Sequence, residues 1–367
     1  MSGTDRLSSA PARWICSDVL MDILPFFGHA QLGLKLALIS PRFDALVDKQ
    51  FSGNRELPIL RTIAIDKDVG LKPKLFVILN SKSVQFPLPD RPLPNKIRFN
   101  CLRIRYIDHS VITFLRSNQH IWGRGMSLRF HMLTANEKPN WEVFAREIWP
   151  IFAPYIHHLF FRNADQLDNL RRLISPTILT DLNQLNSIEA YGMFPDVLNN
   201  FDGPNATISA GQMLSKWLHI PSKDGQPKRL LCFYDHNGSR TKAWVNNFKE
   251  AFLNATTTTT NSPVNYCIRF ETQNPLPIVP FELLNERTNE KLTFEKERGN
   301  EFANEWVFKR CPIFEGTAAA VQWEDENLYA LVNILLRNNN HHRIGPLSPP
   351  TSQQMSNSQS AEVINYL

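Results

Sequence analysis

Residues 141–191 read WEVFAREIWPIFAPYIHHLFFRNADQLDNLRRLISPTILTDLNQLNSIEAY, and the alternation within this stretch decides the fold. Apolar residues recur at helical spacing over residues 141–155 and 167–182, and a short apolar run typical of a strand follows each, at 158–161 and 187–191. Strands that alternate with helices are joined by crossovers, which make consecutive strands parallel. The stretch therefore predicts an α/β fold with a mainly parallel sheet.

The same pattern extends along most of the chain. Further strands are predicted at residues 60–65, 75–79, 102–107, 126–132, 230–234 and 265–270. Further helices are predicted at residues 110–117, 211–218 and 242–255. The strands start roughly 25 to 40 residues apart, which favours a leucine-rich-repeat-like solenoid. Because the intervals are irregular, a compact α/β or α+β domain is the alternative.

The C-terminal third has a different pattern. Residues 281–283 and 291–294 flank a polar segment, residues 285–289, with the composition of a hairpin turn. Another strand is predicted at residues 305–310. We expect the α/β region to end in antiparallel strands.

A short helical unit is predicted before the first strand. Ser17 is the expected N-cap of its first helix, Asp18 favours the positive helix end, and Pro25 should kink or end the helix near Leu24. Two further helices are predicted at residues 31–39 and 42–51. Three helices in about 40 residues make too small a core to stand alone, so this apolar surface needs a partner.

Composition sets the domain organisation. A chain of 367 residues that is 43% hydrophobic and 20% charged is expected to fold over most of its length as two unequal domains. The predicted boundaries are a disordered segment at 1–12, the helical unit at 13–55, the α/β region at 56–337 and a disordered tail at 338–367.

Several cellular settings are not expected from the sequence. No apolar stretch is long enough to span a bilayer and the N-terminus has no signal-peptide centre, so we expect no membrane contact and no secretion. The five cysteines stand singly, which favours a reducing compartment, the cytoplasm or nucleus. The net charge of +5 is spread along the chain, so nucleic acid is not an expected partner.

Catalytic signatures are missing from the sequence. It has no G-x-S-x-G elbow, no phosphate loop, no G-x-G-x-x-G fingerprint and no H-E-x-x-H pair, so we expect no enzyme and no cofactor. His157 and His158 should point to opposite faces of a strand and cannot share a metal. The acidic residues 324–326 are interpreted as a solvated helix face. Arg103 and Arg105 should lie opposite the apolar face of their strand, either as ordinary polar residues or as a recognition surface.

The helical unit resembles an F-box. The resemblance rests on residues 15–20, Ile23 with Leu24, Phe26 with Phe27, and residues 36–47. The F-box pattern implies that the apolar residues bind a Skp-type adaptor, which in turn joins a cullin and a RING subunit. This chain has Ile15 and Cys16 where the family usually has Leu-Pro, and Pro25 interrupts the first helix.

A second resemblance lies in the C-terminal region, in matching order along about a hundred residues. It is carried by residues 214–218, 224–225, 227–228, 264–270, 280–283, Asn285 with Thr288, and 310–313. These blocks are similar to an expanded nematode F-box-associated family. For that family the resemblance implies recognition of a protein substrate, with no catalytic residue.

The two resemblances imply a substrate-recognition adaptor of an SCF-type cullin-RING ubiquitin ligase, in the ubiquitin-like conjugation pathway. The predicted adaptor-binding residues are Ile15, Val19, Leu20, Ile23, Leu24, Leu36, Ile39 and Phe43. The α/β region would capture an unknown protein target. The alternative is a scaffold or protein-interaction module with a degenerate F-box whose helices pack onto the α/β region. A hydrolase or transferase comes third and requires a pocket that gathers His, Asp and Ser.

Overall fold

A computed structural model describes residues 15–52, 59–67, 71–79, 82–95, 97–130, 138–196, 209–223, 225–233, 238–256, 264–272, 278–297 and 304–313. The chain divides into two compact units, Met1–Glu315 and Gly316–Leu367, and all described residues belong to the first. The predicted disordered segments at 1–12 and 338–367 and the acidic residues 324–326 lie outside the described residues.

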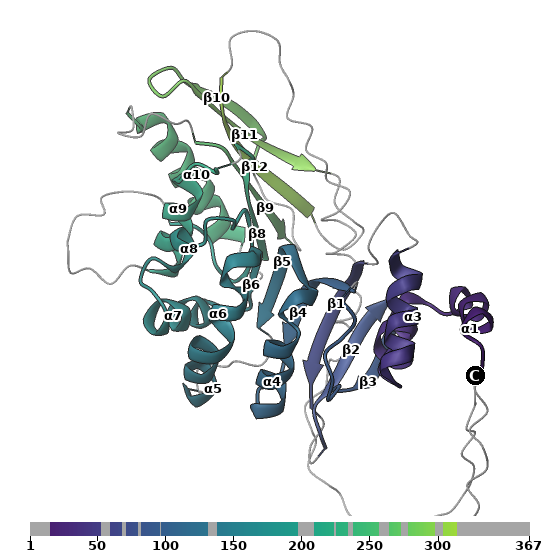
Figure 1. Cartoon of the computed structure of the whole chain (residues 1–367). Helices are drawn as coiled ribbons and strands as arrows, with labels where there is room; N and C mark the ends of the chain where they lie inside the picture. Colours follow the sequence, from purple (N-terminus) through teal and green to yellow (C-terminus); the bar gives the residue numbers. More distant parts are fainter. Residues whose placement is uncertain are drawn as a thin grey trace, which may run out of the picture. The chain divides into compact units, whose positions relative to one another are not determined.

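One large mixed sheet organises the first unit (Figure 1). Its strands follow the order β10-β11-β12-β9-β8-β7-β6-β5-β4-β1-β2-β3. Their bounds are β1 Ile59–Asp66, β2 Lys74–Leu79, β3 Lys82–Pro87, β4 Arg98–Ile104, β5 Trp122–Phe130, β6 Ile156–Phe161, β7 Ser187–Tyr191, β8 Lys228–Phe233, β9 Tyr266–Thr272, β10 Phe281–Asn285, β11 Glu290–Glu297 and β12 Asn304–Pro312.

The sheet has a parallel centre and antiparallel ends. Strands β1 and β4 to β9 pair in parallel, each with its neighbour. At one end of the sheet, β2 and β3 pair antiparallel to their neighbours. At the other end, β12, β11 and β10 do the same. The predicted α/β class and the predicted antiparallel C-terminal strands are confirmed.

Helices connect the parallel strands. They are α4 His109–Ser117, α5 Lys138–Val143, α6 Trp149–Phe152, α7 Ala164–Leu173, α8 Ile178–Asp181, α9 Ala210–His219 and α10 Gly238–Asn254. Asp108, Asn163 and Ser209 cap α4, α7 and α9, because each side chain accepts a hydrogen bond from a backbone N–H three residues on.

The structure corrects several predicted boundaries. The helix predicted over residues 167–182 ends at Leu173 and resumes as α8, because Pro176 disfavours helical geometry at Ser175 and cannot donate a backbone hydrogen bond. The helix predicted over 141–155 is α5 and α6 joined by a π-helical turn. Strand β3 was not predicted, because Pro87 and Pro89 suggest a loop rather than an edge strand.

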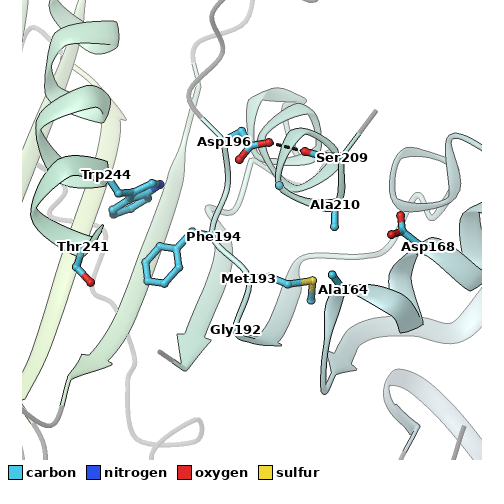
Figure 2. Close-up of a pocket in the computed structure, with 11 residues that line it drawn as sticks. Ala164, Asp168, Gly192, Met193, Phe194, Asp196, Ser209, Ala210, Thr241 and Trp244 are labelled. Carbon is cyan, nitrogen blue, oxygen red and sulfur yellow. Dashed lines mark hydrogen bonds between the residues drawn. The ribbon is translucent and has the colours of Figure 1, made fainter. Parts of the chain in front are cut away.

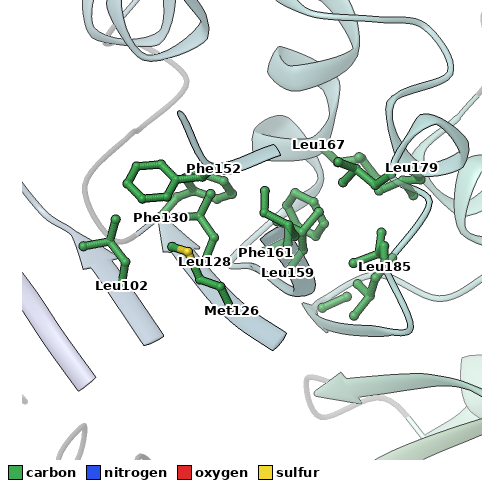
Figure 3. Close-up of a cluster of buried hydrophobic side chains, with 14 of the residues drawn as sticks. Leu102, Met126, Leu128, Phe130, Phe152, Leu159, Phe161, Leu167, Leu179 and Leu185 are labelled. Carbon is green, nitrogen blue, oxygen red and sulfur yellow. The ribbon is translucent and has the colours of Figure 1, made fainter. Parts of the chain in front are cut away.

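The main core lies between the sheet and the helices. One layer of this core consists of side chains from the parallel strands that pair in register on one face of the sheet. Each of them is at most 1% exposed: Ile63, Leu102, Leu128, Leu159, Ile188, Leu230 and Ile268. Phe130 of β5 and Phe161 of β6 extend this layer, and Phe152 of α6 and Leu167 of α7 belong to the same core (Figure 3). Burial of one such side chain stabilises the fold by about 1.5–3 kcal/mol.

The opposite face of the sheet carries a charged row. Its charged members are Arg103, Arg129, Glu189 and Arg269, Phe160 and Leu231 lie in the same row, and all six are buried. Arg129 Nη2 donates to Glu189 Oε2 at 2.7 Å, while burial lowers the pKa of Arg103 to about 10. The prediction that Arg103 faces away from the apolar side is confirmed, but Arg103 is not an ordinary solvated polar residue.

The N-terminal helical unit comprises α1 Ser17–Ile23, a 3-10 turn Leu24–Phe26, α2 His29–Gln31, a π-helical turn Leu32–Leu36 and α3 Pro41–Ser52. The predicted end of the first helix before Pro25 is confirmed. The prediction of Ser17 as N-cap is wrong, because Cys16 holds that position and Ser17 Oγ accepts a hydrogen bond from Arg42 at 3.0 Å.

This unit has a small core of its own and also packs against the main core. Its core consists of Leu20, Leu24, Leu32, Ala37, Leu46, Val47 and Phe51. Ala30 and Leu34 belong instead to the main core. A Cβ on Gly33 would lie 2.6 Å from Ile97 Cδ1, so glycine permits this close approach.

None of the helices in the described ranges is long and apolar enough to cross a lipid bilayer.

Candidate functional site

Exposed apolar side chains concentrate on the helical unit. Of the eleven large apolar side chains exposed among the described residues, six lie between residues 15 and 39: Ile15, Val19, Ile23, Phe26, Phe27 and Ile39. We call these six the apolar face. Its members are 38 to 87% exposed, and Phe26 is the most exposed. Such clustering of apolar side chains at a protein surface is typical of an interaction site.

Helix α1 separates its apolar residues into two groups. Val19 and Ile23 lie one helical turn apart and are 49% and 42% exposed, whereas Leu20 and Leu24 are 8% and 2% exposed. Leu20 and Leu24 fill the core of the helical unit. The helix is therefore apolar on more of its surface than this small core can cover.

Arg42 fixes the start of the apolar face. Its Nη2 donates to the backbone carbonyl of Ile15 and to Ser17 Oγ, which joins the first turn of α3 to the first residue of α1 and the segment before it. Ile39 lies three residues before Arg42, on the other side of Pro41. One side chain thus ties the start of the helical unit to the start of α3.

The structure divides the predicted adaptor-binding residues into three groups. Ile15, Val19, Ile23 and Ile39 are exposed. Leu36 and Phe43 are half-buried and pack against the unit's core, which contains Leu20 and Leu24. Phe26 and Phe27 were missing from the predicted set. The sequence contains a signal for these two residues. Pro25 has to end the first helix, and two aromatic residues follow it directly.

A pocket lies beyond the end of β7, between three helices (Figure 2). Its volume is about 550 Å³. It is lined by Ala164 and Asp168 of α7, by residues 192–194 and Asp196 after β7, by residues 209–211 at the start of α9, and by Thr241 and Trp244 of α10. Phe194 and Trp244 form one wall, with ring centroids 4.8 Å apart and planes at 65°, while Ala164 and Asp168 lie opposite them.

Hydrogen bonds fix the segment that forms the pocket's inner wall. Asp196 N donates to Gly211 O at 3.0 Å, and Trp244 Nε1 donates to Pro195 O at 2.7 Å. The Ser209 hydroxyl donates to the Asp196 carboxylate, and the Ser215 hydroxyl donates to the Asp196 carbonyl. The pocket is therefore preformed, as ligand sites usually are.

Glycine is required where this segment meets α9. A Cβ on Gly211 would lie 2.5 Å from Asp196 Oδ1 and 2.7 Å from the Phe194 carbonyl oxygen. The sequence does not reveal the pocket, because α7, α9 and α10 contribute residues that are far apart in the chain. The residues that line it include no histidine, so the His, Asp and Ser combination of a hydrolase is not assembled there.

A buried polar network joins the last parallel strands to the antiparallel end. Arg310 of β12 donates to Glu290 Oε2 from Nε at 3.0 Å and from Nη2 at 2.5 Å, and Val264 N donates to Glu290 Oε1 at 2.9 Å. Arg310 Nη1 also lies 3.1 Å from His219 Nε2. Partial burial and the charge of Arg310 lower the pKa of His219 to about 4.

Lys228 and Asn285 extend the buried polar contacts of this region. Lys228 Nζ donates to the Trp217 carbonyl, and burial lowers the pKa of Lys228 to about 8. Asn285 Nδ2 donates to Phe252 O at 2.6 Å and to Ala255 O at 3.0 Å. Trp217, Lys228, Asn285 and Arg310 all belong to the C-terminal sequence blocks described above, and they hold this region together.

The paired histidines form no metal site. His157 Nδ1 accepts from Gly125 N at 3.1 Å, whereas His158 contacts Ser187 Oγ at 3.0 Å and Glu189 at 3.4 Å on a neighbouring strand. Within the described ranges, no group of three or more His, Cys, Asp or Glu residues is placed to hold a metal ion.

Comparison of the chain with protein-family models, with curated proteins and with solved structures gives no match.

Proposed function

We propose that this protein is a substrate-recognition adaptor of an SCF-type cullin-RING ubiquitin ligase. The helical unit binds a Skp-type adaptor through Ile15, Val19, Ile23, Phe26, Phe27 and Ile39. The α/β region captures the target protein. The chain performs no chemistry itself, since tethering raises the effective concentration of the target's lysines near the ligase.

The apolar face is the observation that carries this proposal. A helical partner covers apolar side chains spaced one turn apart, as Val19 and Ile23 are in α1. The contact of Ala30 and Leu34 with the sheet core also supports the proposal, because it fixes the helical unit to the target-binding region. A rigid connection gives the ligase a defined geometry on the target.

The parallel strands also fit a repeat architecture. Strands β4 to β9 follow one another in sequence order, and each pairs with the next in parallel. We include in the proposal that this part of the α/β region is a leucine-rich-repeat-like array, whose loops beyond the strand ends recognise the target.

Co-purification of the full chain with a Skp-type adaptor tests the proposal. We expect a stoichiometric complex, and the Val19→Asp variant should lose it while remaining folded. Failure of the folded wild-type chain to bind an excess of adaptor would contradict the ligase role.

The alternative scaffold function has less support. It expects Val19, Leu20 and Ile23 to be buried against the chain's own strands. In the described residues, Val19 and Ile23 are exposed, and Leu20 packs within the helical unit.

A further inference from the structure

Strand β10 stands at one end of the sheet (Figure 1). Among the described strands, β11 alone pairs with it, along its whole length from Phe281 to Asn285. On the other edge of such a strand, alternate residues direct their backbone N–H and C=O groups away from the sheet, where a further strand can pair with them. The free edge of β10 is therefore a template for strand addition.

The opposite end of the sheet is better protected against such pairing. Strand β3 contains Lys82 and Pro87, residue types that oppose edge-to-edge association. Its Phe86 is 1% exposed and lies under the helical unit, with Lys35 Nζ 5.7 Å from the ring centroid. Strand β10 contains neither lysine nor proline. The two ends of the sheet thus differ in how well they resist pairing.

Exposed apolar side chains gather around the free edge. Leu284 of β10 is 57% exposed, and Val279, two residues before the strand, is 81% exposed. Leu253 near the end of α10 is 44% exposed and follows Phe252, whose carbonyl accepts a hydrogen bond from Asn285 Nδ2 at 2.6 Å. Leu253, Val279 and Leu284 are three of the five large apolar side chains exposed in the described part of the α/β region. Apolar surface is therefore concentrated where the backbone is unpaired.

The side chains of β10 alternate between two faces. Phe281 and Leu283 are half-buried on the side of α10, where Lys249 Nζ lies 5.0 Å from the Phe281 ring centroid. Glu282 and Leu284 are exposed on the opposite face. A strand added to this edge would continue both faces and would cover apolar surface on each.

The charge of Glu282 argues against a second copy of this chain as the added strand. Residues directly opposite each other in an antiparallel pair lie on the same face. In the twofold registers that pair three or more residues of the strand, Glu282 would stand opposite Leu284, another Glu282 or Glu286. Each of these registers places a carboxylate against an apolar side chain or a second carboxylate, which is unfavourable.

A basic residue complements the same position. The Glu282 side chain is 60% exposed, with Lys291 of β11 at 3.6 Å, so its carboxylate is accessible to a further partner. A lysine or arginine directly opposite would form a favourable cross-strand pair. The edge therefore fits a strand of a different protein that carries a basic residue among apolar ones.

We propose that the free edge of β10 binds an extended segment of a target protein as an added antiparallel strand. A basic residue of the segment stands opposite Glu282, and apolar residues stand opposite Phe281, Leu283 and Leu284. Backbone hydrogen bonds supply affinity, and the alternating side chains supply specificity. The statement that the segment belongs to a ubiquitination target rests on the proposed function, whereas strand addition itself does not.

The experiment uses the full chain and short fluorescent peptides that contain Val-Ile-Arg-Val between polar flanks. In the antiparallel register, this order places Arg opposite Glu282 and apolar side chains opposite its neighbours in the strand. We expect the Arg peptide to bind at least about 5-fold more tightly than the same peptide with Glu in place of Arg. Equal binding of the two peptides, or no binding of either, would overturn the proposal.

Backbone methylation tests whether the peptide binds as a strand. The N–H groups of a strand point alternately to its two edges, so methyl groups on every second nitrogen block one edge only. Of two Arg peptides methylated on the two alternate sets of nitrogens, one should lose binding at least about 10-fold and the other should keep it. Equal effects of the two sets would contradict strand addition.

Hydrogen exchange locates the peptide on the chain. A saturating amount of the Arg peptide should slow exchange in β10 and leave exchange in β3, the other edge strand, unchanged. Slower exchange in β3 with none in β10 would contradict the assigned edge.

Two variants test the assigned contacts. Leu284→Asp should weaken binding of the Arg peptide at least about 10-fold, because a charge is placed in an apolar contact. The matched control Leu71→Asp, at a residue 50% exposed, should bind like the wild type. Glu282→Lys should reverse the preference, so that the Glu peptide binds more tightly than the Arg peptide. Wild-type binding by Leu284→Asp, or an unchanged preference in Glu282→Lys, would show that these side chains do not face the peptide.

Sedimentation of the free chain tests the competing occupant. We expect a monomer, for the wild type as for Leu284→Asp. A wild-type dimer that Leu284→Asp dissociates would show that a second copy occupies the edge, and that result would overturn the proposal.

Adaptor binding separates this inference from the proposed function. Ile23→Asp should lose the Skp-type adaptor and keep the Arg peptide, and Leu284→Asp should do the reverse. Loss of peptide selectivity with intact adaptor binding refutes only the added strand, whereas intact selectivity without adaptor binding refutes only the ligase role.

Discussion

The helical unit and the α/β region differ in how much of their apolar surface they bury. In the helical unit, seven apolar residues form the core while six large apolar side chains are exposed. The described part of the α/β region exposes only five, Leu71, Ile220, Leu253, Val279 and Leu284, beside a core that extends from Phe86 of β3 to Trp306 of β12. Small units have too little interior to bury all their apolar residues, and under the proposed function a partner covers the remainder.

Because of this difference, we expect substitutions in the two regions to have different effects, on stability in one region and on binding in the other. Changes inside the α/β region should lower the stability of the whole unit. Changes on the apolar face should lower binding alone.

The largest effect on stability is expected from Glu290→Ala. This change leaves the buried Arg310 without its carboxylate, which should cost about 3–5 kcal/mol of unfolding free energy. Denaturant unfolding measures it. The control Glu282→Ala removes an exposed carboxylate, 3.6 Å from Lys291, and should cost less than about 1 kcal/mol. Equal losses in the two variants would show that Arg310 does not need its partner.

The next effect is a dependence of stability on pH through His219. Its Nε2 faces Arg310 Nη1 and its Nδ1 faces the Ser215 carbonyl, so the neutral ring fits this site. The folded-state pKa of about 4 lies below the ordinary histidine pKa of 6.5. Between these values the unfolded chain binds more protons, so this contribution is complete above pH 6.5 and is lost as the pH falls toward 4.

This loss should reach up to about 3 kcal/mol, at about 1.4 kcal/mol for each unit of pKa difference. Urea unfolding at several pH values measures it. The variant His219→Gln should show a flatter profile over the same window. If the unfolding free energy of His219→Gln changed with pH as steeply as that of the wild type, the pH dependence would come from other groups.

A loss of similar size, but confined to one region, is expected from Leu24→Ala in the core of the helical unit. Leu24 is 2% exposed, and its truncation should cost about 2–4 kcal/mol locally. Hydrogen exchange should rise in α1 and α3 before it rises in the sheet, since the two cores are separate clusters. Leu253→Ala, at a residue 44% exposed, is the matched control. If hydrogen exchange rose in the helical unit and the sheet at the same time, the two regions would share one cooperative core.

The sequence predicted the fold better than the site. Strand β7 and the hairpin β10–β11 were found because their apolar residues alternate with polar ones or stand between clear turn residues. Pro25 correctly marked the end of α1. The split between Leu20 and Val19 could not be predicted, because both are apolar and only packing decides which one faces the core.

The pocket was missed for a related reason. Asp168, Asp196 and Thr241 line the same pocket only because parallel crossovers bring three helix starts to the same edge of the sheet. No spacing of residues along the sequence indicates that these helix starts lie together. The C-terminal sequence blocks gave no indication of these contacts, in which Lys228 and Arg310 make buried hydrogen bonds.

The smallest effect on stability is expected from Ile23→Asp, within about 0.5 kcal/mol, because the side chain is exposed. Its effect on binding tests the central claim most directly. The affinity of the full chain for a Skp-type adaptor should be measured by calorimetry for the wild type, Ile23→Asp and Leu253→Asp, where Ile23 and Leu253 are 42% and 44% exposed. We predict that Leu253→Asp binds like the wild type and that Ile23→Asp binds at least about 100-fold more weakly, because a charge is buried in an apolar contact. Unchanged binding by Ile23→Asp would contradict the account.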